Sequence, residues 1–397
     1  MKYVQINTTV NMGSTGRIAE QIGAVAMSRG HTSLIAYGRP SSSSKSRTYQ
    51  IGGPIDVLFH GVRSLLLDGH GLGSKGATRR LVRWLDNEGP DVVSLHNIHG
   101  YFLHFPVLFE YLKQARIPIV WTLHDCWPFT GHCSYFDRVK CEKWQTQCFE
   151  CPMTRYYPKS LIDKSQRNFD LKKAAFSGLS ELTLVTPSAW LKRLVQSSFL
   201  GGYPVRVIHN GVDLATFAPA LEGKEEDLIL GVANVWSDRK GLADFLKLRQ
   251  RLPSTFRIVL IGLNHSQRQA LPEGIEGFGR TESLAELVSW YQRATVYINP
   301  TYSDNFPTTN IEALACGVPV VTYDTGGSPE AIDDLTGRIV SRGDIEGLAA
   351  AIVELTQSEG GSRAVQCRKR AEQKFNQVER FADYVDLYES LVYQPTR

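Results

Sequence analysis

The chain has 397 residues, enough for two domains, and its 42% of hydrophobic and 21% of charged residues exclude the disordered and fibrous classes. Residues 1–200 carry 24 Lys and Arg against 14 Asp and Glu, and this excess of positive charge suits an acidic substrate or an anionic membrane. Because no nucleic-acid-binding motif accompanies the charge, we expect no nucleic acid partner. No run in the sequence approaches the roughly 20 apolar residues of a membrane span, and the N-terminus lacks a signal-peptide pattern. Together these two observations predict a cytoplasmic protein that is at most peripheral at the inner face of the membrane.

Strand-length apolar runs alternate with helical patterns along the whole chain. Most of these runs are nearly continuous in Val, Ile and Leu, which is typical of strands buried on both faces of a parallel sheet. The predicted strands lie at 2–6, 32–37, 91–96, 119–123, 182–186, 205–208, 228–232, 256–261, 296–298 and 318–322, and the predicted helices at 16–29, 75–88, 105–115, 189–197, 241–251, 283–291, 309–316, 345–357, 362–375 and 378–393. This alternation predicts an α/β protein with two doubly wound parallel-sheet domains.

The domain boundary is expected where glycines and prolines flank the motif His209-Asn-Gly-Val-Asp213. The predicted units are an N-terminal domain at 1–204 with a Cys-rich loop at 126–152, a C-terminal domain at 205–377, and a final segment at 378–397. Apolar residues of that segment follow the i, i+3, i+4, i+7 spacing of an amphipathic helix. We expect this helix to return to the N-terminal domain.

Gly13-Ser-Thr-Gly16 follows the first predicted strand and opens a helix. Backbone amides and a helix N-terminus then lie at the carboxyl end of a parallel strand, where anions and polar ligands bind. The motif is neither a complete dinucleotide fingerprint nor a Walker loop. A structural turn that also lines a cleft is the interpretation that we favour.

Five of the seven cysteines lie between residues 126 and 151, and the last four, Cys133, Cys141, Cys148 and Cys151, are spaced C-x7-C-x6-C-x2-C. Four thiolates with one close pair suit a tetrahedral structural zinc. Cysteines scattered in a core are the alternative, which the polar segment between them disfavours. Disulfides are disfavoured by a cytoplasmic location.

Lysines and arginines interleave with large apolar residues over 156–178. A basic amphipathic helix of this kind rests on an anionic membrane or covers the core with its charges in solvent. Both interpretations stay open, and the excess of positive charge in residues 1–200 slightly favours contact with a membrane or with a pyrophosphate-bearing acceptor.

The sharpest motif is Ser303-Asp304-Asn-Phe-Pro-Thr-Thr-Asn-Ile-Glu312. Asp304 stands in a turn after a strand, and Glu312 lies two turns into the next helix, whose N-terminus offers amides to a phosphate or a sugar hydroxyl. Glu312 could accept hydrogen bonds from two vicinal hydroxyls, as a ribose presents them. A helix cap for Asp304 and an exposed carboxylate for Glu312 are the alternatives, and they leave the apolar residues around Glu312 unexplained.

Several motifs together resemble the retaining glycosyltransferases of family 4. They are Asp304-x7-Glu312, Arg239-Lys240-Gly241, the hinge motif at His209 and Thr122-Leu-His124-Asp, and the stretch 122–152 is most similar to the bacterial enzymes of colanic-acid and exopolysaccharide type. The resemblance implies the GT-B fold, in which two Rossmann-like domains face each other across a cleft. It also implies that the second domain binds most of the nucleotide-sugar donor.

Residue roles follow from the same resemblance. Glu312 is expected to bind the donor ribose, Asp304 the donor sugar or its phosphate side, and Lys240 the diphosphate, while His124 orients donor hydroxyls. The wider donor site is expected to include Gly13, Gly16, Arg239, Asn305, Phe306 and Thr308. The family's second phosphate-binding cation has no counterpart near Asn234, where Arg239 or Arg280 could replace it.

The implied reaction moves a sugar from a nucleoside diphosphate sugar to a lipid-pyrophosphate-linked saccharide in capsule, exopolysaccharide or O-antigen synthesis. The acceptor hydroxyl would attack on the face that the diphosphate leaves, and a fixed cation would stabilise the leaving group without metal. No cofactor is therefore expected for catalysis. A sugar-nucleotide epimerase of similar two-domain outline and a non-catalytic sugar-nucleotide-binding protein are the alternatives.

Overall fold

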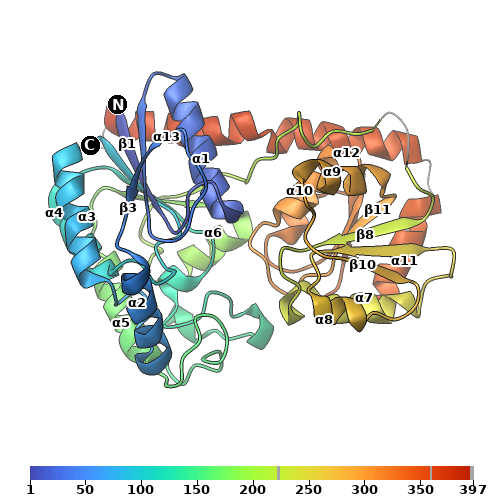
Figure 1. The fold of residues 1–397 in the computed structure, drawn as a ribbon, viewed down its shortest axis with the longest axis horizontal. Coiled ribbons are helices and arrows are strands. Elements are labelled where there is room, and N and C mark those ends of the chain that lie inside the picture. Colours follow the sequence, from blue (N-terminus) through green and yellow to red (C-terminus); the bar gives the residue numbers. More distant parts are fainter. Residues whose placement is uncertain (221–223, 358–359, 394–397) are drawn as a thin grey trace. The chain divides into compact units, whose positions relative to one another are not determined.

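A computed structural model gives the structure of the protein and describes residues 1–220, 224–357 and 360–393. The chain forms two compact units: unit 1 is Met1–Ile208 with Phe381–Arg397, and unit 2 is His209–Arg380. Each unit is built on one parallel sheet with helices packed against it (Figure 1). The prediction of two doubly wound α/β domains is confirmed. The last four residues of the predicted segment 378–397 lie outside the described residues.

The sheet of unit 1 has seven parallel strands in the order β3-β2-β1-β4-β5-β6-β7. The strands are β1 (Lys2–Asn7), β2 (Thr32–Tyr37), β3 (Arg47–Gln50), β4 (Val92–Leu95), β5 (Ile119–Thr122), β6 (Leu182–Thr186) and β7 (Val205–Val207), and the helices are α1 (Gly13–Ser28), α2 (Pro54–Leu67), α3 (Lys75–Glu88), α4 (Phe105–Ala115), α5 (Ser165–Phe176) and α6 (Ala189–Gln196). Strand order reverses between β1 and β4. In doubly wound sheets, ligands bind beyond the carboxyl ends of the strands at such a reversal.

The end of unit 1 differs from the predicted boundary at residue 204. β7 pairs in parallel with β6, through Val205 opposite Leu184, and so completes the first sheet and not the second. The glycines and the proline at 201–204 form the turn between α6 and β7. Such residues mark a turn inside a domain as readily as a link between domains.

The last helix, α13 (Gln377–Tyr393), supplies part of the core of unit 1. Its buried side chains Phe381, Tyr384, Val385 and Tyr388 cluster with Tyr3, Ile18, Ile22, Val92, Val120 and Val185. The Tyr388 hydroxyl donates to Ser94 Oγ at 2.8 Å inside this layer. Residues from both ends of the chain therefore build the same hydrophobic layer (Figure 1).

The sheet of unit 2 has six parallel strands in the order β10-β9-β8-β11-β12-β13. The strands are β8 (Leu228–Val232), β9 (Arg257–Ile261), β10 (Ile275–Phe278), β11 (Val296–Asn299), β12 (Val320–Tyr323) and β13 (Gly337–Val340), and the helices are α7 (Leu242–Arg249), α8 (His265–Gln269), α9 (Leu284–Arg293), α10 (Thr308–Ala315), α11 (Ile345–Gln357) and α12 (Gly360–Phe375). The order reverses between β8 and β11, which makes the carboxyl ends of these two strands the expected ligand edge.

The basic stretch at 156–178 contains α5, and this helix covers the core of unit 1. Phe169 and Phe176 are buried in that core. Lys172 is buried with them, and its Nζ donates to the main-chain oxygens of Trp127 at 2.7 Å and Thr130 at 2.9 Å. The apolar side of α5 itself is therefore not available to a membrane, whereas Leu161 and Ile162, which precede the helix in the same stretch, are exposed. Among the described residues, no helix combines the length and the apolar character needed to cross a bilayer.

Candidate functional site

The predicted donor residues of unit 2 gather where its strand order reverses. Asp304 follows β11, and Lys240 ends a short 3-10 turn that follows β8. Because β8 and β11 are parallel neighbours, the loops that follow them meet at one edge of the sheet. Gly241 comes next with φ of 74°, and a Cβ there would lie 2.2 Å from the Pro300 carbonyl oxygen, so only glycine fits beside Lys240.

One carboxylate holds two cations in this cluster. Lys240 Nζ donates to Asp304 Oδ2 at 2.6 Å, and Arg239 Nη1 lies 3.6 Å from the same oxygen and donates to the Ser303 carbonyl. Burial raises the pKa of Asp304, but the two cations outweigh burial and hold this pKa below its usual value. The cluster of Arg239, Lys240 and Asp304 thus keeps an excess positive charge, which suits an anionic ligand.

Glu312 lies in the second turn of α10, on the helix that begins beyond Asp304. Its Oε2 accepts a hydrogen bond from the hydroxyl of Tyr291 at 3.0 Å. Tyr291 is fully buried, and burial together with the carboxylate raises its pKa, so the hydroxyl keeps its proton. The carboxylate of Glu312 therefore has a fixed orientation, unlike an exposed helix carboxylate.

The other predicted donor residues of unit 2 shape the loop before α10. The main-chain N–H of Asn305 donates to Asp304 Oδ1 at 3.0 Å. Phe306 is buried and stacks on His209, with ring centroids 4.8 Å apart and planes 21° apart. Thr308 is the first residue of α10. Phe306 thus anchors the loop by packing, and its ring is not presented to a ligand.

His124 lies at the carboxyl end of β5 in unit 1 and is paired with a histidine that the sequence analysis missed. His96 follows the neighbouring strand β4, and its Nδ1 is 3.2 Å from His124 Nε2, with the rings stacked. His96 Nε2 is 3.0 Å from Gln5 Oε1, whose amide nitrogen donates to the Ala19 carbonyl. This network assigns the protons: His96 donates to Gln5, His124 donates to His96, and His124 Nδ1 is left as an acceptor.

Burial makes this histidine pair neutral. It lowers the pKa of His124 to about 4, and it lowers the pKa of His96 well below the ordinary value for histidine. A neutral imidazole with Nδ1 as acceptor can take a hydrogen bond from a sugar hydroxyl. His124 is therefore suited to orient a ligand at neutral pH and is a poor source of protons there.

Asp125 does not pair with the adjacent His124 but with a second histidine that the sequence analysis missed. His99 Nε2 lies 2.9 Å from Asp125 Oδ2, and His99 Nδ1 lies 3.1 Å from the hydroxyl of Tyr157. Burial raises the pKa of Asp125, but His99, the main-chain N–H of Trp127 and His124 together outweigh burial and hold this pKa below its usual value, so the carboxylate stays charged. The signal for both missed histidines was present, because His96 ends and His99 follows the strand predicted at 91–96, much as His124 follows the strand predicted at 119–123.

Gly13 and Gly16 lie at the start of α1, beyond the carboxyl end of β1. Gly13 has φ of 66°, and a Cβ on Gly16 would lie 2.7 Å from Thr9 Oγ1 and 3.2 Å from the Thr9 carbonyl oxygen. Both glycines are thus required by the turn itself. The predicted catalytic and donor-binding residues fall into two sets, with Gly13, Gly16 and His124 in unit 1 and the others in unit 2.

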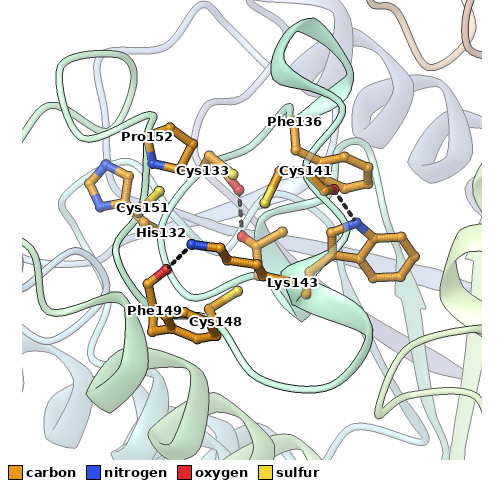
Figure 2. A pocket seen from close by; sticks show the side chains of 11 residues that line it. His132, Cys133, Phe136, Cys141, Lys143, Cys148, Phe149, Cys151 and Pro152 are labelled. Carbon is orange, nitrogen blue, oxygen red and sulfur yellow. Dashed lines mark hydrogen bonds between the residues drawn. The ribbon is translucent and has the colours of Figure 1, made fainter.

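The four spaced cysteines line one small pocket in the loop between β5 and α5. Figure 2 shows Cys133, Cys141, Cys148 and Cys151 around it, with His132 beside them. The thiol of Cys133 donates to the sulfur of Cys151 and lowers its pKa. Among the described residues, however, no group of three or more His, Cys, Asp and Glu side chains could hold a metal ion as they stand. The cysteines thus share a pocket without a preformed set of zinc ligands.

Comparisons with known proteins match both units. A family model described as Glycosyltransferase Family 4 matches residues 15–216, and one described as Glycosyl transferases group 1 matches residues 226–358. WcaC of Escherichia coli (strain K12), described as a colanic acid biosynthesis glycosyl transferase, is 24% identical over 98% of this chain and 100% of its own length.

Solved structures share the fold over nearly the whole chain. Sucrose-phosphate synthase of Thermosynechococcus elongatus has a TM-score of 0.73 at 18% identity, with 99% of each chain covered. HepE of Anabaena, solved in complex with UDP-glucose, has a TM-score of 0.65 at 15% identity, with 98% of this chain and 100% of that chain covered. The two Rossmann-like units have the GT-B architecture of these glycosyltransferases. With a family model that spans more than half of its residues, the chain belongs to glycosyltransferase family 4.

Proposed function

We propose that this glycosyltransferase moves a sugar, with retention of anomeric configuration, from a nucleoside diphosphate sugar to a lipid-pyrophosphate-linked saccharide at the inner face of the cytoplasmic membrane. The observation that carries the donor assignment is the cluster of Arg239, Lys240 and Asp304 at the reversal point of the unit 2 sheet. The UDP-glucose in the structure of HepE supports a nucleotide-sugar donor. The likeness to WcaC supports a role in exopolysaccharide synthesis, with capsule and O-antigen as related products.

Each charged residue has a distinct task in this proposal. Lys240 and Arg239 bind the diphosphate, and Arg239 supplies the second cation that is missing near Asn234. Asp304 holds Lys240 in position through their 2.6 Å contact and faces the phosphate side of the donor sugar. Glu312, oriented by the hydroxyl of a buried tyrosine, accepts hydrogen bonds from the ribose hydroxyls.

The chemical step needs no protein base in this scheme. The acceptor hydroxyl attacks the anomeric carbon on the face that the diphosphate leaves. As the bond to the phosphate oxygen breaks and the bond to the acceptor oxygen forms, the acceptor proton passes to the departing diphosphate. The two cations stabilise the charge that builds up there, and the neutral ring of His124 holds a donor hydroxyl through Nδ1.

A thermal-shift panel of UDP-, GDP- and dTDP-sugars tests the donor, because a bound donor raises the midpoint of unfolding. With the stabilising donor in hand, proton NMR of the sugar released in the absence of acceptor reports the anomer that forms first. Retention is expected. Release of the opposite anomer first would exclude the retaining scheme, and the appearance of an epimerised donor would favour the epimerase alternative.

A further inference from the structure

The helix α2 is amphipathic in the opposite sense to an ordinary surface helix. Its residues His60 and Ser64 are buried against unit 1. Its large apolar side chains face outward with exposed fractions between 36% and 69%: Ile55, Leu58, Phe59, Val62, Leu65, Leu66 and Leu67. We call these seven side chains the α2 apolar face. Single exposed hydrophobic residues are common on proteins, but a contiguous group of this size marks an interaction site.

Polar contacts fix α2 in this orientation. His60 Nε2 accepts from the amides of Gly71 at 3.0 Å and Gly73 at 3.2 Å, and His60 Nδ1 lies 3.0 Å from Ser74 Oγ. Burial lowers the pKa of His60 to about 3, which keeps the ring neutral and able to accept both bonds. A Cβ on Gly73 would lie 2.4 Å from the imidazole ring, so the following loop closes tightly over it. The apolar face is therefore held outward by the structure beneath it.

A neighbouring segment extends the apolar face and adds positive charge. The amide of Leu161 donates to the Leu65 carbonyl at 2.8 Å, which places the exposed side chains of Leu161 and Ile162 beside the end of α2. The amide of Lys164 donates to Asp68 at 2.8 Å, just beyond the helix. Exposed Lys159 and Lys164 thus flank the apolar pair, and exposed Arg63 lies on α2 itself.

We propose that the α2 apolar face, with Leu161 and Ile162, docks this enzyme on an anionic lipid bilayer. Apolar side chains that enter the boundary of the acyl chains, surrounded by cations that meet anionic headgroups, are the chemistry of interfacial membrane binding. The excess of positive charge in residues 1–200 adds a longer-range attraction to the same surface. This inference rests on the proposed function in one respect, because a lipid-linked acceptor lies in that bilayer.

Co-sedimentation with vesicles tests the docking directly. The wild-type protein is expected to sediment with vesicles of phosphatidylethanolamine and phosphatidylglycerol, and about tenfold less with phosphatidylcholine alone. The double variant Leu58→Asp/Phe59→Asp should bind the anionic vesicles on the order of a hundredfold more weakly. Leu335→Asp, which changes an equally exposed leucine of unit 2, is the matched control and should bind as the wild type does.

Light scattering on the same proteins without vesicles distinguishes a second copy of the chain as the occupant. A wild-type dimer that the double variant converts to a monomer would overturn the proposal, as would vesicle binding that the double variant retains. A wild-type protein that neither binds vesicles nor dimerises would also overturn it. Nucleotide-induced thermal shifts report on the donor site independently. Vesicle binding without any nucleotide shift would leave the docking valid and remove the proposed function.

Discussion

Replacement of Lys240 by methionine tests whether the cluster beyond β8 and β11 binds a diphosphate. Lys240 Nζ is 2.6 Å from Asp304, and the two side chains are only 19% and 14% exposed, so the cation acts at short range with limited screening by solvent. A charge-assisted hydrogen bond contributes about 1.5–3 kcal/mol. We therefore expect Lys240→Met to raise the dissociation constant of the bound nucleoside diphosphate about 10- to 150-fold.

The same substitution disturbs the ion pair, and a second variant separates the two effects. With Lys240 removed, the carboxylate of Asp304 keeps the main-chain N–H of Asn305 and, 3.6 Å away, the cation of Arg239, and we expect a loss of about 1–3 kcal/mol in the free energy of unfolding. Lys240→Met/Asp304→Asn removes both charges. This double variant should recover most of the stability measured by urea unfolding, while its affinity for the diphosphate stays low.

Calorimetric titration with whichever of UDP, GDP and dTDP stabilises the wild type most gives the dissociation constants. Lys247→Met is the matched control, because Lys247 also lies in unit 2, pairs with Asp244 at 3.5 Å and is 63% exposed. It changes the net charge equally and should leave affinity unaltered. If Lys240→Met binds the nucleotide as tightly as Lys247→Met does, Lys240 is not a diphosphate ligand.

Three further predictions concern single side chains. Glu312→Ala should lower kcat/KM for transfer, with a loss of about 2–4 kcal/mol of transition-state stabilisation. Tyr291→Phe, which removes only the hydroxyl that orients Glu312, should lower kcat/KM by less, and equal losses in the two variants would contradict the orienting role. Burial lowers the pKa of His124 to about 4, so between about pH 6.5 and pH 4 the unfolded chain binds a proton that the folded chain does not. The free energy of unfolding should therefore fall as the pH drops through this range. His124→Gln should make that fall smaller, as measured by urea unfolding at a series of pH values. Lys172→Met should destabilise the protein by about 1–3 kcal/mol, because it removes the donor of the buried Thr130 carbonyl and leaves the Trp127 carbonyl with only the long contacts from Thr130. Thermal unfolding of Lys173→Met, which changes the exposed neighbour, should match the wild type.

The sheets could be predicted from the sequence because their strands are buried on both faces. Runs such as Val92–Leu95 and Ile119–Thr122 are almost wholly apolar, and such runs have few alternatives to a central parallel strand. The cluster of Lys240 with Asp304 was also predictable in kind, because both follow strands whose carboxyl ends meet. What the sequence could not reveal is that the two side chains contact each other directly.

The missed features have physical explanations. Helix α2 was missed although its apolar residues follow the i, i+3, i+4, i+7 spacing of an amphipathic helix. The spacing does not reveal that here the apolar side is exposed while His60 and Ser64 are buried. For His96 and His99 the sequence offered their place at the end of a predicted strand, as it did for His124, but not the contacts that the two side chains make. His96 and His124 come into contact because β4 and β5 are paired as neighbours in the sheet, and the sequence alone does not reveal this pairing.

The order of synthesis has a consequence for unit 1. Its hydrophobic layer needs Phe381, Tyr384, Val385 and Tyr388, yet the whole of unit 2 is translated between Ile208 and these residues. A nascent unit 1 on the ribosome thus has its sheet strands but lacks α13, and Val120 and Val185 stay uncovered until the last helix emerges. Domains usually fold in the order in which they are made, and uncovered apolar surface promotes aggregation. Unit 2 can therefore complete its fold first, and the N-terminal unit of this protein is the last to finish.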